Sequence, residues 1–196
     1  MRIRPAAADD QDALWTMLEP VIRAGEVFAL PRDMDRTAAL AYWFAPTHTV
    51  FIAEEGEDDK DSNMGEETYP ATILGSYYIQ PNQAGPGSHV ANCGYLTAPW
   101  STGRGVASAM CAHSLNYARH AGYHAMQFNF VISTNLPAIH LWTKHGFRTL
   151  ARLPQAFQHP TEGYVDALIM WQSLSNPLGP AKNAPFSKTH SSLSNL

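Results

Sequence analysis

Hydrophobic and polar positions follow two different periods along this chain, and together they predict a mixed α/β fold. Apolar residues at every third or fourth position predict helices near 9–22, 35–44, 106–120 and 136–144. Alternating or compact β-branched and aromatic runs predict strands near 1–4, 49–53, 72–80, 90–97, 125–132, 147–153 and 165–171. In this order, a mixed central β-sheet would carry helices on both of its faces.

Two polar segments interrupt this pattern, and we expect neither to belong to the folded core. The acidic stretch at 54–70 is expected to be a solvated hairpin loop, with attraction of cationic substrates as the alternative. Residues 175–196 are rich in Ser, Pro, Asn and Lys and are expected to form a flexible C-terminal tail. One domain is therefore expected over 1–174, with Asp9 capping its first helix and Asp33 or Asp35 capping its second.

Composition narrows the classes of function. The 196 residues are 45% hydrophobic and carry a formal net charge of −4 without a basic cluster, which argues against a nucleic-acid partner. No apolar stretch is long enough to span a bilayer and the first residues lack a signal-peptide core, so a cytoplasmic protein without a membrane partner is expected. Cys93 and Cys111 lack metal-ligand spacing, the nine histidines are scattered, and no metal is expected.

The clearest chemical signal is the short motif Thr102-Gly103-Arg104-Gly105-Val106-Ala107, between a predicted strand and a predicted helix. Small residues let the backbone approach a ligand closely, and the free N–H groups at a helix start face an anion. The motif lacks the Gly-Lys-Ser/Thr of a Walker A loop and the wider glycine spacing of a dinucleotide-binding fingerprint. It indicates a pyrophosphate cradle, although one glycine-rich turn is weak evidence by itself.

A second motif follows downstream as Asn135-x-x-Ala138-x-x-x-Trp142-x-x-x-Gly146-Phe147. With the first motif, it resembles the GNAT superfamily of N-acetyltransferases, which pairs Q/R-x-x-G-x-G/A with an Asn that opens a helix ending in Gly-Phe. The resemblance implies a GNAT fold in which splayed parallel strands bind acyl-CoA, with acetyl-CoA as cosubstrate. The coenzyme contacts that it implies are Leu96, Thr97, Thr102, Gly103, Arg104, Gly105, Val106, Ala107, Ser108 and Asn135.

The chain departs from this family pattern at two positions. Thr102 replaces the usual Gln or Arg, although Gly103 and Arg104 still supply a turn and a cation. Trp142 replaces a frequent Tyr that would protonate the leaving thiolate, and an indole N–H is not a usable acid. The general acid is therefore unassigned, and structural roles are favoured for the histidines. We expect direct attack of an amine on the thioester, with backbone N–H groups near Tyr95 or Leu96 stabilising the oxyanion.

A narrower resemblance bears on the substrate. The segments Tyr78-Ile79-Gln80-Pro81-Asn82, Ser88-His89-x-x-Asn92-x-Gly94, Phe128-Asn129 and Thr134-Asn135, with Trp142, are similar to the yeast N-acetyltransferases that detoxify the proline analogue azetidine-2-carboxylate. This similarity implies a small amino acid or amino acid analogue as substrate, contacted by Asn92 and Asn129. From the residues alone, each amide either secures a backbone irregularity or binds a zwitterion together with the other.

Other functions remain open at this point. Trp142 is compatible with an acyl-CoA-binding sensor that has lost its chemistry, and the acidic stretch is compatible with acetylation of a protein N-terminus or Lys. A small-molecule amine is the expected partner, and the sequence leaves a homodimer open.

Overall fold

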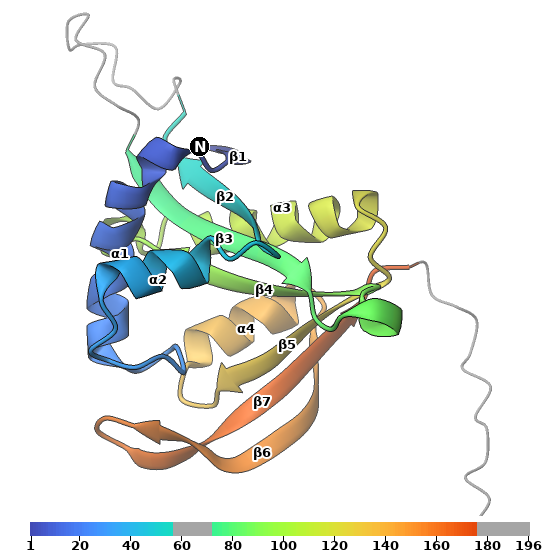
Figure 1. Cartoon of the computed structure of the whole chain (residues 1–196). Coiled ribbons are helices and arrows are strands. Elements are labelled where there is room, and N and C mark those ends of the chain that lie inside the picture. Colours follow the sequence, from blue (N-terminus) through green and yellow to red (C-terminus); the bar gives the residue numbers. More distant parts are fainter. Residues whose placement is uncertain (57–71, 176–196) are drawn as a thin grey trace, which may run out of the picture.

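The computed structural model describes residues 1–56 and 72–175 (Figure 1). A seven-stranded mixed sheet forms its centre, with the strand order β1-β2-β3-β4-β5-β7-β6. The strands are β1 Arg2–Pro5, β2 Thr49–Glu54, β3 Ile73–Pro81, β4 Val90–Thr97, β5 Ala125–Ile132, β6 Arg148–His159 and β7 Gly163–Ser173. Among the strands that the structure describes, only the central β4–β5 pair is parallel, and its neighbours on both sides run antiparallel.

The four α-helices of the described residues cover both faces of the sheet, as the sequence predicts. They are α1 Gln11–Ala24, α2 Arg36–Trp43, α3 Val106–His120 and α4 Leu136–Lys144. Figure 1 shows α1 and α2 together on one face, and α3 and α4 on the other. Successive strand residues alternate between these layers: Tyr78 packs with α1 and α2, whereas Tyr77 and Ile79 pack with α3. No helix among the described residues is long and apolar enough to cross a membrane.

The predicted helix starts are partly correct. The N-cap of α2 is Asp35, whose carboxylate accepts from the N–H of Ala38 at 2.8 Å. Asp9, however, does not cap α1: a 3-10 turn over Ala8–Asp10 precedes that helix, and Asp10 occupies its N-cap position.

The last hairpin is longer than expected from the sequence. Strand β6 is an edge strand whose residues are mostly exposed, and its pairing with β7 shifts register twice. Pro154 and the left-handed Gln155, at φ 50°, lie in the second shift. An exposed strand with bulges has no regular alternation of apolar and polar residues. The ends of β6 therefore could not be predicted from the sequence. Most of the acidic stretch, and all of the tail except Ser175, lie outside the described residues.

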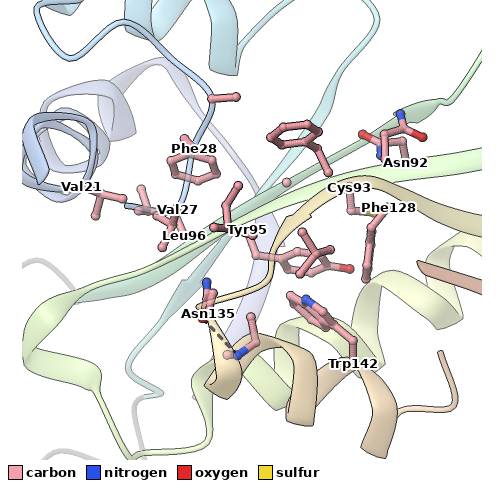
Figure 2. A pocket seen from close by; sticks show the side chains of 18 of the residues that line it. Val21, Val27, Phe28, Asn92, Cys93, Tyr95, Leu96, Phe128, Asn135 and Trp142 are labelled. Carbon is pink, nitrogen blue, oxygen red and sulfur yellow. Dashed lines mark hydrogen bonds between the residues drawn. The ribbon is translucent and has the colours of Figure 1, made fainter. Parts of the chain in front are cut away.

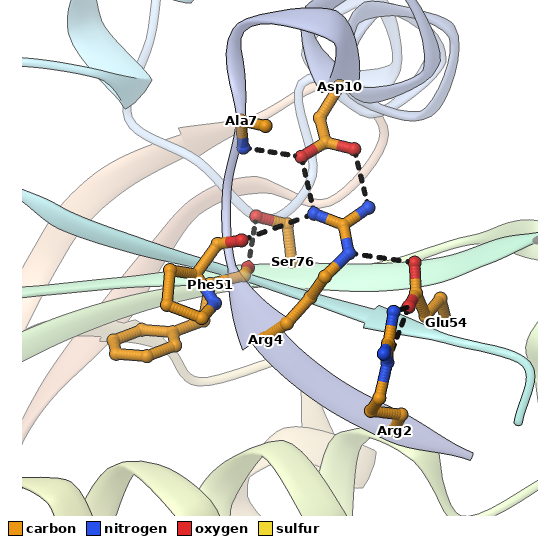
Figure 3. Close-up of polar contacts among 8 residues, drawn as sticks. Arg2, Arg4, Ala7, Asp10, Phe51, Glu54 and Ser76 are labelled. Carbon is orange, nitrogen blue, oxygen red and sulfur yellow. Dashed lines mark hydrogen bonds and ion pairs between the residues drawn. The ribbon is translucent and has the colours of Figure 1, made fainter.

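A charged network fastens the first strand to the rest of the fold (Figure 3). The guanidinium of Arg4 donates to both carboxylate oxygens of Asp10, at 2.7 and 2.8 Å, and to Glu54 at 2.9 Å. Glu54 also accepts from Arg2, and Asp10 accepts from the N–H of Ala7 at 2.6 Å. Both carboxylates are buried, so these pairs join β1, β2 and the start of α1.

Replacement of Asp10 by asparagine is expected to lower stability by about 1–3 kcal/mol at neutral pH, because a buried charged partner of Arg4 is lost. Hydrogen bonds from Arg4, and then from Ala7, hold the pKa of Asp10 below its ordinary value of 3.8. A depressed pKa in the folded state stabilises the fold above pH 3.8, and this stabilisation disappears as the pH falls through the folded-state pKa.

Urea unfolding of the wild-type chain and of Asp10→Asn between pH 7 and pH 3 tests this. The difference in unfolding free energy should be constant at neutral pH and shrink below about pH 4. A difference that does not change with pH would contradict the ionic role of Asp10.

Candidate active site

A cavity of about 640 Å³ opens where β4 and β5 separate. Its walls come from these two strands, from β3, from the starts of α3 and α4, and from α1 and α2 with the loop between them (Figure 2). Figure 2 shows Val21, Val27 and Phe28 on the α1 side, and Asn135 and Trp142 on the α4 side. None of the residues lining the cavity, within the described part of the chain, is Asp, Glu, Lys, Arg or His.

The separation of the two parallel strands is abrupt. β4 pairs with β5 only at Val90–Ala125 and Ala91–Met126. Beyond these pairs, β5 has a register irregularity against β7 between Phe128 and Val131. The facing edge of β4 is therefore unpaired by β5 from residue 93 to residue 97, as expected for strands that admit an acyl-pantetheine chain.

The hydrogen-bond pattern on the other side of β4 identifies which N–H groups face this gap. Val90 accepts from Asn82 at 2.7 Å, and Ala98 donates to Leu74 at 2.9 Å. The register of the β3–β4 ladder is unbroken between these points. The backbone N–H and C=O groups of even-numbered β4 residues therefore hydrogen-bond to β3, and those of odd-numbered β4 residues face β5. The N–H of Tyr95 thus faces the gap. The N–H of Leu96, the other position expected for the oxyanion donor, is directed toward β3 by the same register.

Asn92 lies where the parallel ladder stops. Its Nδ2 donates to the carbonyl oxygen of Gln127 at 2.8 Å. In a continuing parallel ladder that carbonyl would accept from the N–H of Cys93. The side chain therefore takes the place of a backbone bond, which satisfies β5 and leaves β4 free. This is the backbone-securing role that the sequence left open. Asn92 also lines the cavity, and its Oδ1 has no hydrogen-bond partner among the described residues.

Replacement of Asn92 by alanine is expected to reduce kcat/KM about tenfold to hundredfold, because an unpaired carbonyl costs about 1–3 kcal/mol. Closure of the gap would raise the KM for both coenzyme and amine. Asn129→Ala, at the cavity rim, is the matched control and should raise only the KM for the amine. Steady-state kinetics distinguish these patterns, and an unchanged coenzyme KM in Asn92→Ala would contradict the role in the gap.

Asn129 also lines the cavity but belongs to an exposed amide chain. Its Nδ2 donates to the Oδ1 of Asn82 at 2.6 Å, and its Oδ1 accepts from Gln127 at 2.7 Å. Asn92 and Asn129 both line the cavity, Asn92 from β4 and Asn129 from β5, and each already has protein partners. Their contact with the substrate stays a prediction.

The glycine-rich motif forms the turn that leads into α3. Gly103 and Gly105 have φ values of 78° and 77°, a left-handed conformation that other residues rarely adopt, and open space surrounds both. The first helical bond runs from Ala109 to Gly105, so the N–H groups of residues 106–108 precede it and are oriented toward an anion. This geometry fits the pyrophosphate of a coenzyme.

Arg104 of this motif and Ser108, which follows it, have protein partners that the sequence did not reveal. Arg104 pairs with Glu55 at 3.0 Å, so its cation is partly neutralised before any ligand arrives. Ser108 bonds through Oγ to Nε2 of His145 at 2.8 Å, which links α3 to the end of α4. Their predicted coenzyme contacts would therefore come from the backbone of Ser108 and from an Arg104 that leaves Glu55.

Asn135 caps α4 at the opposite end of the gap from Asn92. Its Oδ1 accepts from the N–H of Ala138 at 3.2 Å, which leaves the Nδ2 as a donor beside the cavity (Figure 2). Leu96, Thr97 and Ala107 line the same cavity. The predicted coenzyme residues thus fall into two groups, one along the gap and one at the turn before α3.

Asn135→Ser is expected to raise the coenzyme KM while retaining stability, because serine is a good N-cap but lacks the longer amide donor. Asn135→Ala is the matched comparison and should lose both functions, with a stability cost of about 0.5–2 kcal/mol. Thermal melting and coenzyme kinetics on both variants separate the roles. Wild-type coenzyme kinetics in Asn135→Ser would restrict Asn135 to capping.

Among the described residues, no side chain near the gap is prepared as an acid or a nucleophile. Burial raises the pKa of the Cys111 thiol to about 12 and that of Cys93 further still. The Tyr95 ring lies 4.8 Å from that of Trp142, but its hydroxyl bonds to Ser114 at 2.6 Å, and burial raises its pKa. No three His, Cys, Asp or Glu side chains group as metal ligands in the described residues, although His120 and His124 stand four apart.

Sequence reasoning missed several residues of this cavity. Tyr42, Tyr78, Gln80 and Phe28 line it, and only the alternation of β3 could have placed Tyr78 and Gln80 on the same face as Asn92. Tyr42 and Phe28 come from α2 and from the loop before it. Their approach depends on the packing of α1 and α2 on the sheet, for which the sequence carries no local signal.

Comparisons with known proteins agree with this geometry. The model of the acetyltransferase (GNAT) family matches residues 15–147. The curated N-acetyltransferase aca1 of Schizosaccharomyces pombe is 28% identical over 151 residues, which are 76% of this chain and 72% of that protein.

Solved structures show the same fold. A GCN5-related N-acetyltransferase from Kribbella flavida is 32% identical with a TM-score of 0.78, covering 88% of this chain and 96% of its own. The structure of yncA from Salmonella typhimurium, solved with its cofactor acetyl-CoA, is 20% identical with a TM-score of 0.73, covering 93% of this chain and 98% of its own. With the family model matched over most of the domain, this chain belongs to the GNAT family of N-acetyltransferases.

Proposed function

We propose that this enzyme transfers an acetyl group from acetyl-CoA to the amine of a small amino acid or proline analogue, such as azetidine-2-carboxylate. The observation that carries this proposal is the uncharged but polar cavity between β4 and β5. It offers hydroxyl and amide groups and aromatic walls to a small neutral or zwitterionic ligand. A lysine-rich peptide or a polyamine would find no carboxylate among the described residues that line it. A role in detoxifying amino acid analogues follows from this substrate class.

The residues present fit acetyl-CoA. The turn at Gly103–Gly105 and the start of α3 would hold the pyrophosphate, and the free edge of β4 would hold the pantetheine chain beside Asn135. Bound there, the coenzyme supplies a thioester activated for acyl transfer. The fit rests on open backbone donors and on a gap that β5 does not close.

Within this frame the protein contributes mainly position and electrostatics. The N–H of Tyr95 faces the gap and would donate to the thioester oxygen as negative charge develops on it. The amine would attack directly, because Cys93 and Cys111 are buried thiols with raised pKa values, and no base lies beside them in the part of the chain that the structure describes. Since the cavity lining has no acidic or basic side chain in residues 1–56 and 72–175, the amine proton would leave through water. Holding the two substrates together supplies much of the rate enhancement.

A turnover screen with acetyl-CoA tests the proposed function. Thiol release would be measured with single amines: proline-like amino acids, other amino acids, polyamines, and peptides with a free N-terminus or Lys. We expect the highest kcat/KM among the proline-like amino acids. Turnover confined to peptides would favour a protein acetyltransferase, and coenzyme binding without turnover of any amine would favour a sensor; either result would overturn the proposal.

A further inference from the structure

Two tyrosine hydroxyls meet inside the cavity. Tyr42 of α2 and Tyr78 of β3 both line it, and their hydroxyl oxygens are 2.9 Å apart. The Tyr78 ring is buried and held on several sides: His48 stacks on it at 3.9 Å between ring centroids, and Trp43 meets it edge-on at 5.1 Å. The position of the Tyr78 hydroxyl is therefore fixed by packing before any ligand binds.

The absence of a side chain at Gly94 brings this hydroxyl over β4. A Cβ on Gly94 would lie 2.4 Å from Cε1 of Tyr78 and 2.8 Å from its hydroxyl oxygen. The ring thus lies directly across the strand at Gly94, on the face that also carries Asn92. Since the Tyr95 N–H faces the gap one residue further on, the tyrosine pair stands beside the expected position of the reacting carbonyl.

One hydroxyl proton of the tyrosine pair is available to bind a ligand. Two hydroxyls carry two protons, and their mutual bond uses one of them. The structure records no second partner for either hydroxyl in residues 1–56 and 72–175. Burial, and then the neighbouring Tyr42, raises the pKa of Tyr78 far above that of a free phenol, so it stays a neutral donor at physiological pH.

Two neighbouring amides, those of Gln80 and Asn92, add a further donor and an acceptor beside the tyrosine pair. Gln80 accepts from Thr47 through Oε1 at 3.1 Å, which leaves its Nε2 as a donor on the cavity side. Asn92, directly opposite Gln80 in the β3–β4 register, spends its Nδ2 on Gln127 and retains Oδ1 as an acceptor. The wall therefore presents donors at Tyr78 and Gln80, and an acceptor at Asn92.

We propose that the Tyr42–Tyr78 hydroxyl pair binds the carboxylate of an α-amino acid substrate, while its amine donates to Oδ1 of Asn92. A carboxylate only accepts and an amine donates, so this polarity matches a zwitterion in one orientation. The assignment differs from recognition of both charged groups by Asn92 and Asn129, because the free donors lie on the tyrosines. The inference rests on the proposed function, since it names how that substrate is held.

The test compares azetidine-2-carboxylate with its carboxamide, which keeps the ring and the amine but lacks the charged carboxylate. In Tyr78→Phe and Tyr42→Phe, kcat/KM for the acid should fall at least about tenfold relative to kcat/KM for the carboxamide, mainly through the KM of the amine. The KM for acetyl-CoA should stay at its wild-type value. The ratio of kcat/KM for the acid to kcat/KM for the carboxamide does not depend on how much of the enzyme is folded. If one of the two variants does not fold, the other still tests the proposal.

Tyr77→Phe is the matched control. Tyr77 neighbours Tyr78 on the same strand but faces the other layer, where its hydroxyl bonds to Nδ1 of His113 at 2.6 Å. This variant should leave the ratio unchanged. An equal loss for both substrates in the two cavity variants, or no loss, would overturn the tyrosine assignment while leaving amino acid acetylation intact. If the wild-type enzyme acetylated neither substrate, the proposed function itself would fail, and this inference with it.

Discussion

Replacement of Gly94 by alanine is expected to remove most of the activity toward the amine. The added Cβ would lie 2.4 Å from Cε1 of Tyr78, a distance at which the ring must move. Because His48 and Trp43 pack against that ring, it has no free space to enter on those sides. Overpacking of this kind destabilises a structure by about 1–3 kcal/mol. If the strain displaces the Tyr78 ring and so weakens binding of the transition state, kcat/KM falls about fivefold to 150-fold.

Measurement of amine kcat/KM and of thermal stability in Gly94→Ala checks this expectation. The matched control is Tyr78→Leu, with and without the Gly94 substitution, because leucine lacks the outer ring atoms that the Cβ would meet. The cost of Gly94→Ala should be much smaller in the Tyr78→Leu background. An equal cost in both backgrounds would show that contact with the Tyr78 ring is not the cause.

Replacement of Gly105 by aspartate is expected to raise the coenzyme KM about tenfold to hundredfold, because a fixed negative charge would stand beside the pyrophosphate. Gly105 has φ 77°, so any side chain there is strained, but Asp and Asn tolerate this region better than most residues. Gly105→Asn is therefore the matched control, with nearly the same size and backbone cost but no charge.

Coenzyme kinetics on both variants at low and high salt decide the matter. The difference between Asp and Asn should be large at low ionic strength and shrink as salt screens the charge. Equal coenzyme KM values in the two variants would show that the pyrophosphate does not bind at this turn.

Much of the fold could be predicted because its central elements are strongly patterned. The bounds of β4, β5 and α4 agree with those expected, since each is a compact run between clear turn residues. The edge hairpin could not be bounded in this way, because β6 is exposed and bulged. The start of α1 was misplaced because Asp10 is held by Arg4, six residues earlier, rather than by the helix.

Residues that lie around the cavity could be chosen from the sequence, but which of their atoms are free to bind a ligand could not. Asn92, Asn129 and Asn135 do line one cavity. Which of their atoms remain free depends on partners such as the Gln127 carbonyl and Asn82, which pair only in the folded sheet. The gap-facing N–H of Tyr95 likewise follows from the β3–β4 register and not from sequence. Tyr42 lines the cavity because α2 packs against the sheet, and no sequence motif predicts this packing.

Competition for a limiting amount of isotopically labelled acetyl-CoA tests the central claim most directly. Equal concentrations of azetidine-2-carboxylate, a polyamine and a lysine-containing peptide would be offered together, and mass spectrometry would locate the label. An uncharged cavity between β4 and β5 predicts that the label goes mainly to the amino acid analogue. Label mainly on the peptide or the polyamine, or label retained on the coenzyme, would contradict the account.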